Sequence, residues 1–256
     1  MLAELRKNRL LRMLAEEQKI IVTEAARALG VSLGTIRSDL KALEEEGRLV
    51  RTHGGAIPVG SSSEPAFGER QLIRFEQKAA IGRAAAGLIG DSVSIMLDAS
   101  STAMELAKRL PEERPLSVIT NGLSTAQLLA AKRLFNVIVT GGVVRPGSDE
   151  VEGLLAKSLF DQVHADILFA SAHGLTLDQG MTEFSYQEAE LKRVMAANVP
   201  NVVALVDSSK LGRRSLATSV ELSRIRTVVT DQGADPAFLN ALRERGIAVV
   251  IAGDDA

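Results

Sequence analysis

The stretch VTEAARALGVSLGTIRSDLKALEEEGRLVRTHGGA, residues 22–56, decides the fold of the first part of this chain. Thr23 is a typical helix N-cap residue, and apolar residues follow it at helical spacing as far as Leu29. We expect Gly30 to end this helix, because glycine readily adopts the positive φ angle found at helix C-termini. The stretch therefore begins with a short helix and a sharp turn.

A second helix is predicted directly after the turn. Ser32 is its N-cap candidate, and one face carries apolar residues at helical spacing: Leu33, Ile36, Leu40 and Leu43. The opposite face presents Thr35, Arg37, Ser38 and Lys41 to solvent. Two helices joined by so short a turn form a helix-turn-helix, whose second helix enters the DNA major groove. The alternative is a helical hairpin used for packing or dimerisation, because helix–glycine–helix patterns are common.

Elements on both sides complete a winged helix-turn-helix. Residues 3–17 predict a helix with an inward stripe of Leu5, Leu10, Leu11 and Leu14, and residues 20–22 predict a short strand. Residues 48–58 predict a β-hairpin, the wing, that turns at Gly54–Gly55. His53 lies in the wing and is either a DNA contact or an ordinary surface turn residue. We expect DNA contacts from Thr23, Ser32, Thr35, Arg37, Ser38, Lys41, Arg51 and His53.

Three motifs in this part of the chain carry a family resemblance. TIRSDL, L-EEEG-LVR and HGGA, in that order, resemble the DNA-binding signature of the DeoR family of bacterial transcriptional regulators. The resemblance continues through nearly all of the chain and implies double-stranded operator DNA as a partner. Family members usually carry a second arginine after TIR, where this chain has Ser38. The departure leaves the operator sequence open.

Composition restricts the class of protein. The chain has 256 residues, 46% of them hydrophobic and 24% charged, which predicts a folded protein of two domains. No apolar run reaches the ~20 residues of a membrane span, and the absence of cysteine fits a reducing cytoplasm. Residues 1–58 contain ten Lys/Arg and eight Asp/Glu, so they carry +2 of a total of −2 and leave −4 for the remainder. So small a basic excess indicates that two or more DNA-binding domains bind one DNA together, as in a homodimer or homotetramer.

Beyond the wing, the pattern predicts a linker and an α/β domain. We divide the chain into a DNA-binding domain at 1–58, a linker at 59–68 and an effector-binding and oligomerisation domain at 69–256. One helix is expected at 69–89, with Leu72 buried. Strands are expected at 93–98, 116–120, 137–140, 165–170, 201–207, 227–230 and 247–251, and helices near 102–110, 123–132, 153–161, 185–197 and 235–245. Short apolar strands alternating with helices predict a mainly parallel sheet that is covered on both faces.

In such a sheet, ligands bind beyond the carboxyl ends of the strands. The Ser-Ser-Thr loop at 100–102 leaves a strand and opens a helix, where unpaired N–H groups and hydroxyls favour a phosphate over simple N-capping. Asn121–Gly122 and Gly141–Gly142 follow the next two strands and are either functional or mere turns. Lys210 follows a later strand and either points into the same cleft or is solvated.

The family resemblance extends to these loops. The motifs DASST, TNG, GG--R, AHGLTLDQGMTE, EAELKR and DSSK match the DeoR-family sensor domain, which is similar to ribose-5-phosphate isomerase and glucosamine-6-phosphate deaminase and binds phosphorylated sugars. The resemblance implies these ligand-binding residues: Asp98, Ser100, Ser101, Thr102, Asn121, Gly142, Gly174, Glu188 and Lys210. His173 stands where a regulator usually has small residues. The related isomerases have an acidic DGAD-type loop where this chain has ASAHG.

Three functions compete for this sequence. A sugar-phosphate isomerase or deaminase needs a base beside a carbonyl, and the candidates, none of which lies in a catalytic motif, are Asp98, Glu183, Glu188 and His173. A nucleic-acid-binding scaffold leaves the phosphate-type loop unexplained. The histidines, at 53, 164 and 173, lack metal-ligand spacing, so we expect neither a metal nor a cofactor. The sequence therefore predicts a non-enzymatic transcriptional regulator, a repressor of a carbohydrate-utilisation operon that a phosphorylated sugar releases from DNA.

Overall fold

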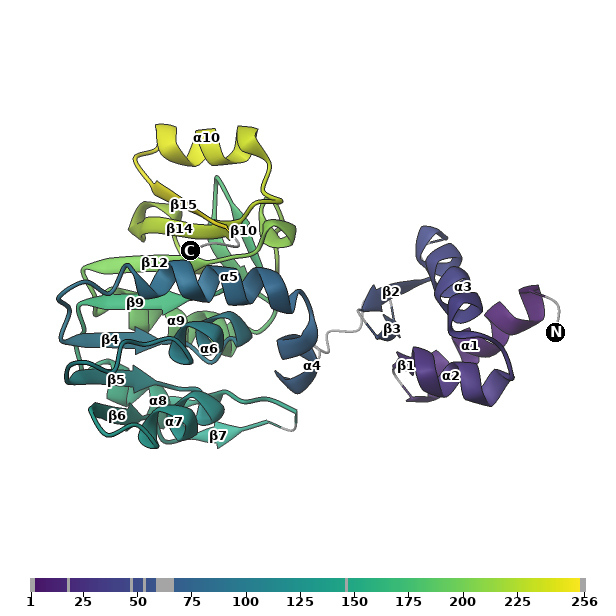
Figure 1. Ribbon diagram of the computed structural model, residues 1–256, viewed down its shortest axis with the longest axis horizontal. Helices are drawn as coiled ribbons and strands as arrows, with labels where there is room; N and C mark the ends of the chain where they lie inside the picture. The colour runs from purple at the N-terminus through teal and green to yellow at the C-terminus, as the bar shows by residue number, and fades with distance from the viewer. Residues whose placement is uncertain are drawn as a thin grey trace. The chain divides into compact units, whose positions relative to one another are not determined.

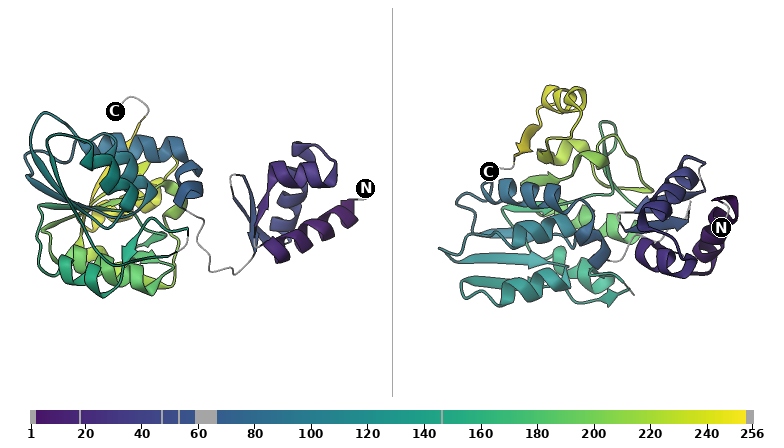
Figure 2. Two further views of the ribbon diagram at one scale, coloured as in Figure 1. Left: turned by 90° about the horizontal axis from the view of Figure 1, so that it is seen from below. Right: turned by 45° about the vertical axis from the view of Figure 1, so that its right-hand side comes forward.

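A computed structural model describes residues 3–17, 19–46, 48–52, 54–58, 67–145 and 147–253, without the side chains of 15–17 and 58. The chain divides into two compact units, Met1–Glu64 and Pro65–Ala256, which we call the N-terminal unit and the C-terminal unit (Figures 1 and 2). His53 lies outside the described residues, as does the linker predicted at 59–68 up to residue 66. The first described element after it begins at Phe67, so the last two residues of the predicted linker are helical.

The N-terminal unit is a winged helix-turn-helix, as the sequence predicts. Its described elements are α1 (Ala3–Glu17), β1 (Ile20–Ile21), α2 (Val22–Leu29), α3 (Leu33–Glu45), β2 (Leu49–Thr52) and β3 (Gly55–Pro58). The strands pair antiparallel in the order β1-β3-β2. One apolar core joins the three helices to the wing through buried residues that include Leu10, Leu14, Ile36, Leu40, Leu43 and Leu49. The inward stripe of α1 is shorter than predicted, because Leu5 is 60% exposed.

The two helix ends at the turn have the chemistry that the sequence predicts. Gly30 adopts φ 64° and ends α2, and the Ser32 side chain accepts a hydrogen bond from the Thr35 amide at 3.1 Å to begin α3. The prediction that Thr23 caps α2 was wrong. The N-cap is Ile21, two residues earlier, and the helix begins at Val22, whose amide donates to the carbonyl of Gly54 in the wing at 2.7 Å. Backbone of the wing therefore replaces a side-chain cap.

Gly55 has a different role from the predicted one. It belongs to β3 and pairs with Thr52, so it is a strand residue and not part of the turn. A Cβ at this position would collide with the carbonyl of Ile20 in β1. Glycine is therefore required by the close approach of two strands.

The C-terminal unit is built on a seven-stranded parallel sheet of order β15-β14-β12-β9-β4-β5-β6. Its strands are β4 (Ser94–Leu97), β5 (Leu116–Thr120), β6 (Phe135–Val139), β9 (Ile167–Ala170), β12 (Asn201–Leu205), β14 (Ile225–Asp231) and β15 (Ala248–Ala252). Each corresponds to one of the seven predicted strands. The mainly parallel α/β fold is thus confirmed.

Helices cover both faces of this sheet (Figures 1 and 2). Ile95 and Leu97 of β4 point to one face, where they pack with residues of α5 and α6, and Met96 points to the other, with α8 and α9. The helices are α4 (Phe67–Leu72), α5 (Phe75–Ala86), α6 (Ser101–Ala107), α7 (Leu123–Ala130), α8 (Leu154–Phe160), α9 (Tyr186–Ala197) and α10 (Pro236–Glu244). The helices predicted near 102–110, 123–132, 153–161, 185–197 and 235–245 are confirmed.

The single helix predicted at 69–89 was wrong. Two helices, α4 and α5, occupy this region, and between them Arg74 adopts a left-handed backbone with φ 53°. Its guanidinium lies 2.9 Å from a carboxylate oxygen of Asp207 and donates to Ser208 Oγ at 2.7 Å. Tertiary contacts therefore hold a backbone conformation that the local pattern does not predict. Leu72, predicted to be buried, is 69% exposed at this break.

Smaller elements lie outside the parallel sheet, and the sequence did not predict them. They are a hairpin of β7 (Val143–Val144) and β8 (Val151–Glu152), an antiparallel sheet of β10 (Gly174–Thr176), β11 (Gly180–Glu183) and β13 (Ala217–Val220), and the 3-10 turns η1 (Ser208–Lys210) and η2 (Leu222–Arg224). These strands are short, and β11 pairs with the distant β13. No local alternation of polar and apolar residues reveals such pairings.

Candidate functional site

The strand order places one polar site at the topological switch point of the sheet. From β4 the chain runs outward through β5 and β6, then returns to β9 on the other side of β4 and continues through β12. The carboxyl ends of β4 and β9 therefore flank the position at which open α/β sheets bind ligands. We call this position the crevice. Asp98 follows β4 and Ser171 follows β9, and the Ser171 amide donates to Asp98 Oδ2 at 3.0 Å.

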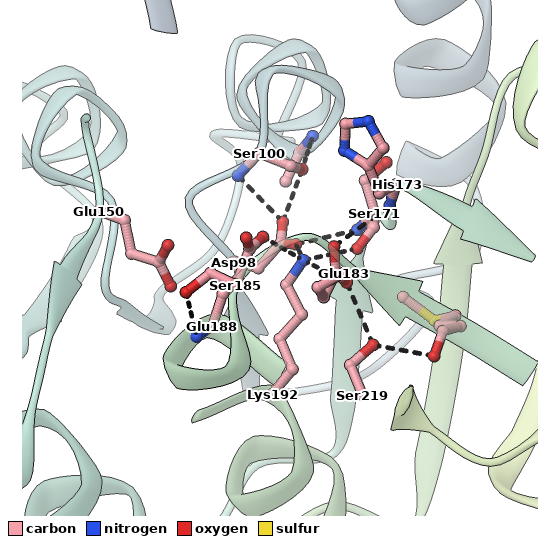
Figure 3. A network of polar contacts seen from close by, with 12 residues as sticks. Asp98, Ser100, Glu150, Ser171, His173, Glu183, Ser185, Glu188, Lys192 and Ser219 are labelled. Atoms are coloured by element: carbon pink, nitrogen blue, oxygen red, sulfur yellow. Dashed lines mark hydrogen bonds and ion pairs between the residues drawn. The ribbon is translucent and has the colours of Figure 1, made fainter. Parts of the chain in front are cut away.

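A buried ammonium organises this crevice. Lys192 of α9 lies 3.1 Å from a carboxylate oxygen of Asp98, 2.8 Å from Glu183 and 2.9 Å from Glu188, and it also donates to the carbonyl of Ser171 at 2.8 Å (Figure 3). The side chain of Lys192 is 4% exposed. The EAELKR motif pointed to Glu188, whereas Lys192 of the same motif was not predicted to belong to the site. The signal was the i,i+4 spacing of the two residues on one helix face.

Carboxylates outnumber ammonium groups in this network, and their titration reflects it. Burial raises the pKa of Glu183 to about 8 and raises the pKa of Glu150 well above its ordinary value. Burial alone would lower the pKa of Lys192, but the charges of Glu183 and Glu188 raise it well above its ordinary value. The network is therefore charged at Lys192 and holds protons on part of its carboxyl groups at neutral pH.

Two further lysines, one bonded to Ser171 and the other close enough to the first for their charges to interact, lie near this network. Lys210, in η1, donates to Ser171 Oγ at 2.9 Å, so its ammonium points into the crevice and is not merely solvated. Lys78 of α5 is 4% exposed and donates to the carbonyl of Arg70. Burial and then the charge of Lys210 lower the pKa of Lys78 to about 8. Lys78 was not predicted as a site residue, because a lysine on a helix is ordinarily solvated.

The Ser-Ser-Thr loop contributes one cap and two buried hydroxyls. Ser100 is the N-cap of α6: it accepts from the Ala103 amide at 3.0 Å, and its hydroxyl donates to Asp98 at 2.6 Å. Ser101 and Thr102 are buried. Thr102 Oγ1 has no hydrogen-bond partner among the described residues. Simple capping therefore accounts for Ser100 and leaves the hydroxyl of Thr102 available.

The remaining candidates take distinct positions around the crevice. Asn121, after β5, donates to Glu150 Oε1 at 3.0 Å. Gly142 and Gly174 each meet neighbouring backbone so closely that a Cβ would collide with a carbonyl, of Glu152 and of Arg213 respectively. This close packing is what the two glycines do in the structure, and their contact with a ligand stays a prediction.

The ring of His173 packs against the ring of Phe184, with centroids 3.5 Å apart and ring planes tilted by 46°. Burial and then the charge of Lys210 lower the pKa of His173 to about 3, so the imidazole is neutral near pH 7.

Within the described ranges there is no group of three or more His, Asp or Glu residues placed to hold a metal ion.

The predicted DNA contacts lie on the outward side of the N-terminal unit. Six of them are exposed and Thr35 is half-buried, the exposed ones being Thr23, Ser32, Arg37, Ser38, Lys41 and Arg51. Arg37 of α3 and Arg51 of the wing line one hollow together with Glu44 and Thr52. Glu44 accepts from the Arg51 amide at 2.8 Å and so fixes the wing against α3. The recognition helix and the wing thus present one partly cationic surface.

These features define a DNA-binding transcriptional regulator with a separate α/β unit that carries a polar crevice. The chain matches the DeoR-like helix-turn-helix domain over residues 6–61 and the DeoR C terminal sensor domain over residues 73–232. It belongs to the DeoR family of transcriptional regulators. In the described part of the chain, no helix is both long and apolar enough to cross a membrane.

Relatives that cover nearly the whole chain are named as regulators. The chain is 40% identical to the HTH-type transcriptional regulator GolR of Listeria innocua, over 96% of this chain and 98% of the relative. It is 29% identical to a putative aga operon transcriptional repressor of Escherichia coli O157:H7, over 97% and 94%. It is 28% identical to the glycerol-3-phosphate regulon repressor of Escherichia coli K12, over 94% and 96%. A ribose 5-phosphate isomerase from Methanocaldococcus jannaschii shares 19% identity at a TM-score of 0.40, over 54% of each chain.

Proposed function

We propose that this protein represses a carbohydrate-utilisation operon and that a phosphorylated sugar, bound in the C-terminal unit, releases it from operator DNA. The observation that carries the proposal is the polar cluster at the switch point, where Lys210 is bonded to Ser171 beside the carboxyl groups around Lys192, and Lys78 lies close enough to Lys210 for their charges to interact. Two relatives are named as repressors of the aga operon and of the glycerol-3-phosphate regulon, which supports this class of operon and effector.

The two sides of the crevice suit the two ends of a sugar phosphate. Lys78 and Lys210 supply positive charge for the phosphate, and the hydroxyl of Thr102, together with Ser101, supplies neutral donors. The carboxyl group of Glu188, whose side chain is 12% exposed, accepts hydrogen bonds from sugar hydroxyls. Asp98 is fully buried with both oxygens bonded, so it positions the Ser100 loop and Ser171. An unphosphorylated sugar would leave the lysine side of the crevice unfilled, so we expect weak binding of such sugars.

An isomerase or deaminase is the competing function, and the geometry disfavours it. Proton abstraction needs a carboxylate or imidazole that is free to take a proton. Asp98, Glu183 and Glu188 are all bound to Lys192. We therefore assign these carboxyl groups to binding, and we expect saturable binding without turnover.

Release from DNA requires a path from the crevice to the first unit. Lys210 belongs to η1, and Asp207 and Ser208, at the start of that turn, hold the guanidinium of Arg74. Arg74 separates α5 from α4, the element that follows the linker. A phosphate that draws Lys210 away from Ser171 shifts η1, and Arg74 transmits that shift to α4. The N-terminal units of a homodimer or homotetramer then no longer match the spacing of the operator half-sites, and operator affinity falls.

A thermal-shift screen tests the proposal. The purified full chain is heated with a panel of sugar phosphates and with their unphosphorylated parents, and the mixtures are assayed for products. We expect a phosphate-dependent rise in melting temperature without product formation. If no sugar phosphate shifts the melting temperature, the sensor role is wrong. If a product forms, the enzyme alternative is correct.

A further inference from the structure

Glu150 is a buried carboxyl group of the crevice to which the sequence assigned no role. It directly precedes β8 and is 7% exposed. Figure 3 shows its side chain extending toward the network around Lys192, and no dashed line joins it to that network. The hydrogen bond that the structure gives its carboxyl group comes from Asn121 Nδ2, at 3.0 Å to Oε1.

The backbone around Glu150 is fixed beside the end of β5. The Val151 amide donates to the carbonyl of Asn121 at 2.8 Å, and the Leu123 amide donates to the carbonyl of Asp149 at 3.0 Å. Asp149 also accepts from the amide and the hydroxyl of Ser124. Glu150 is therefore held in place by bonds on both of its chain neighbours, and its position does not depend on its own side chain.

Asn121 supplies a second, independent observation. Its side chain is 1% exposed, and its amide oxygen Oδ1 has no hydrogen-bond partner within the described ranges. A buried acceptor without a donor is unfavourable. The amide group that holds Glu150 thus keeps an unused, buried acceptor beside the Glu150 carboxyl group.

The two groups together favour a hydroxyl. Burial, and then repulsion by Glu188, raise the pKa of Glu150 and so favour its protonated form, which can donate a hydrogen bond. A ligand atom between them must donate to Asn121 Oδ1 and accept from Glu150. An ammonium group cannot accept, and a phosphate dianion cannot donate and is repelled by Glu188. A hydroxyl group does both.

We propose that Glu150 and Asn121 bind one hydroxyl group of the sugar part of the effector, which makes Glu150 a specificity-determining residue. The inference rests on the proposed function, because it assumes that a sugar phosphate occupies the crevice with its phosphate at Lys78 and Lys210. It adds that one particular hydroxyl of the sugar is read on the β8 side, away from the lysines.

The test compares Glu150→Met with Glu150→Gln in the full chain. Calorimetric titrations use the sugar phosphates of the thermal-shift panel, their mono-deoxy analogues and inorganic phosphate. The methionine variant should bind the preferred sugar phosphate about tenfold or more weakly, because an apolar group replaces a hydrogen-bonding one. For one deoxy analogue, and for inorganic phosphate, wild type and variant should bind equally. The glutamine variant, which keeps a neutral donor and the bond from Asn121, should bind within about threefold of wild type.

The matched control is Glu190→Met. This substitution removes a carboxylate of α9 that pairs with Arg193 outside the crevice, and the variant should bind every probe as wild type does. Equal loss for all analogues and inorganic phosphate would overturn the assignment, and so would unchanged binding by Glu150→Met. A loss in the glutamine variant as large as in the methionine variant would also overturn it. If the wild-type protein binds no sugar phosphate at all, the proposed function fails and this inference fails with it.

Discussion

The two units place their charges in opposite ways. In the N-terminal unit the described core is apolar, and Asp39, which pairs with Arg6, is the one buried charged residue among the residues described. In the C-terminal unit charged side chains lie inside, at the strand ends, and Lys192 with its carboxylate partners is almost fully buried. Exposed cations suit a long polyanion that approaches a surface, whereas buried charges suit a small ligand that enters a crevice.

This difference separates stability from affinity. Removing an exposed charge from the N-terminal unit should change DNA affinity and leave folding intact, because solvent replaces the lost contact. Removing a buried charge from the C-terminal unit should change folding, because its partners stay buried without compensation. Variants in the two units therefore test whether surface charges determine DNA affinity and buried charges determine stability.

The largest effect is expected for Lys192→Met. Loss of the ammonium leaves Asp98, Glu183 and Glu188 without their shared cation, which should lower the free energy of unfolding of the C-terminal unit by ~3–5 kcal/mol. The chain has one tyrosine, Tyr186, and no tryptophan, so tyrosine fluorescence during urea denaturation reports on this unit. The exposed Arg243→Met on α10 is the control and should change stability by less than about 0.5 kcal/mol. A Lys192→Met midpoint equal to that of wild type would show that the buried network does not stabilise the unit.

Arg37→Ala should produce the next largest effect, on operator binding and not on stability. Loss of a base contact in the major groove should weaken binding by ~1–3 kcal/mol. Fluorescence anisotropy with an operator duplex selected from random sequences measures it. Arg226→Ala, an exposed arginine of the C-terminal unit, is the control. An unchanged affinity for Arg37→Ala would remove Arg37 from the interface.

Effector affinity should depend on pH through Lys78. Its pKa of about 8 lies below the ordinary value, so the ammonium that attracts phosphate is present below pH 8 and is lost as the pH rises past 8. Affinity should therefore fall by up to ~tenfold between pH 8 and 9. The phosphate stays a dianion throughout this range, because its second pKa is ~6. Calorimetry measures the effector affinity of wild type and of Lys78→Arg at both pH values. If the affinity of the arginine variant falls as much as that of wild type, a group other than Lys78 is responsible.

The smallest effect is expected for Lys41→Ala. Lys41 is exposed on α3, with Glu45 3.9 Å away, and we expect it to contact a phosphate of the DNA backbone. Its loss should weaken binding to all sequences alike and reduce the slope of log affinity against log salt by ~1. A sequence-dependent loss would instead mean that Lys41 reads a base.

The sequence pattern predicts those elements of the fold whose formation depends on residues close together in the chain. The seven parallel strands are short apolar runs between helices, and Gly30 and Ser32 have unambiguous end chemistry. The helix break at Arg74 was not predicted, because the helical pattern continues through this residue. Its left-handed backbone is explained by contacts with the carboxylates of Asp207 and Asp231, which are distant in the sequence. Pairings between short, distant strands, such as β11 with β13, were missed for the same reason.

The site was predictable only in outline. The rule for strand ends directed attention to the loops that contain Asp98 and Lys210, and the structure brings both to Ser171. Lys192, Lys78 and Glu150 were missed, because a lysine or glutamate on a helix or loop reads as solvated until its neighbours are known. Their burial depends on the packing of α9, α5 and the β7–β8 hairpin, which no short window of sequence encodes.

The central claim is that a sugar phosphate bound in the C-terminal unit controls DNA binding by the N-terminal unit. The most direct measurement is the release of operator duplex, followed by anisotropy, as the sugar phosphate identified by thermal shift is added to wild type and to Lys210→Gln. Lys210 is half-buried and donates to Ser171, a bond that glutamine can keep, but the variant lacks the charge that attracts phosphate. The variant should therefore bind operator as tightly as wild type and stay bound at effector concentrations that release wild type. Release of both proteins at the same effector concentration would contradict the account.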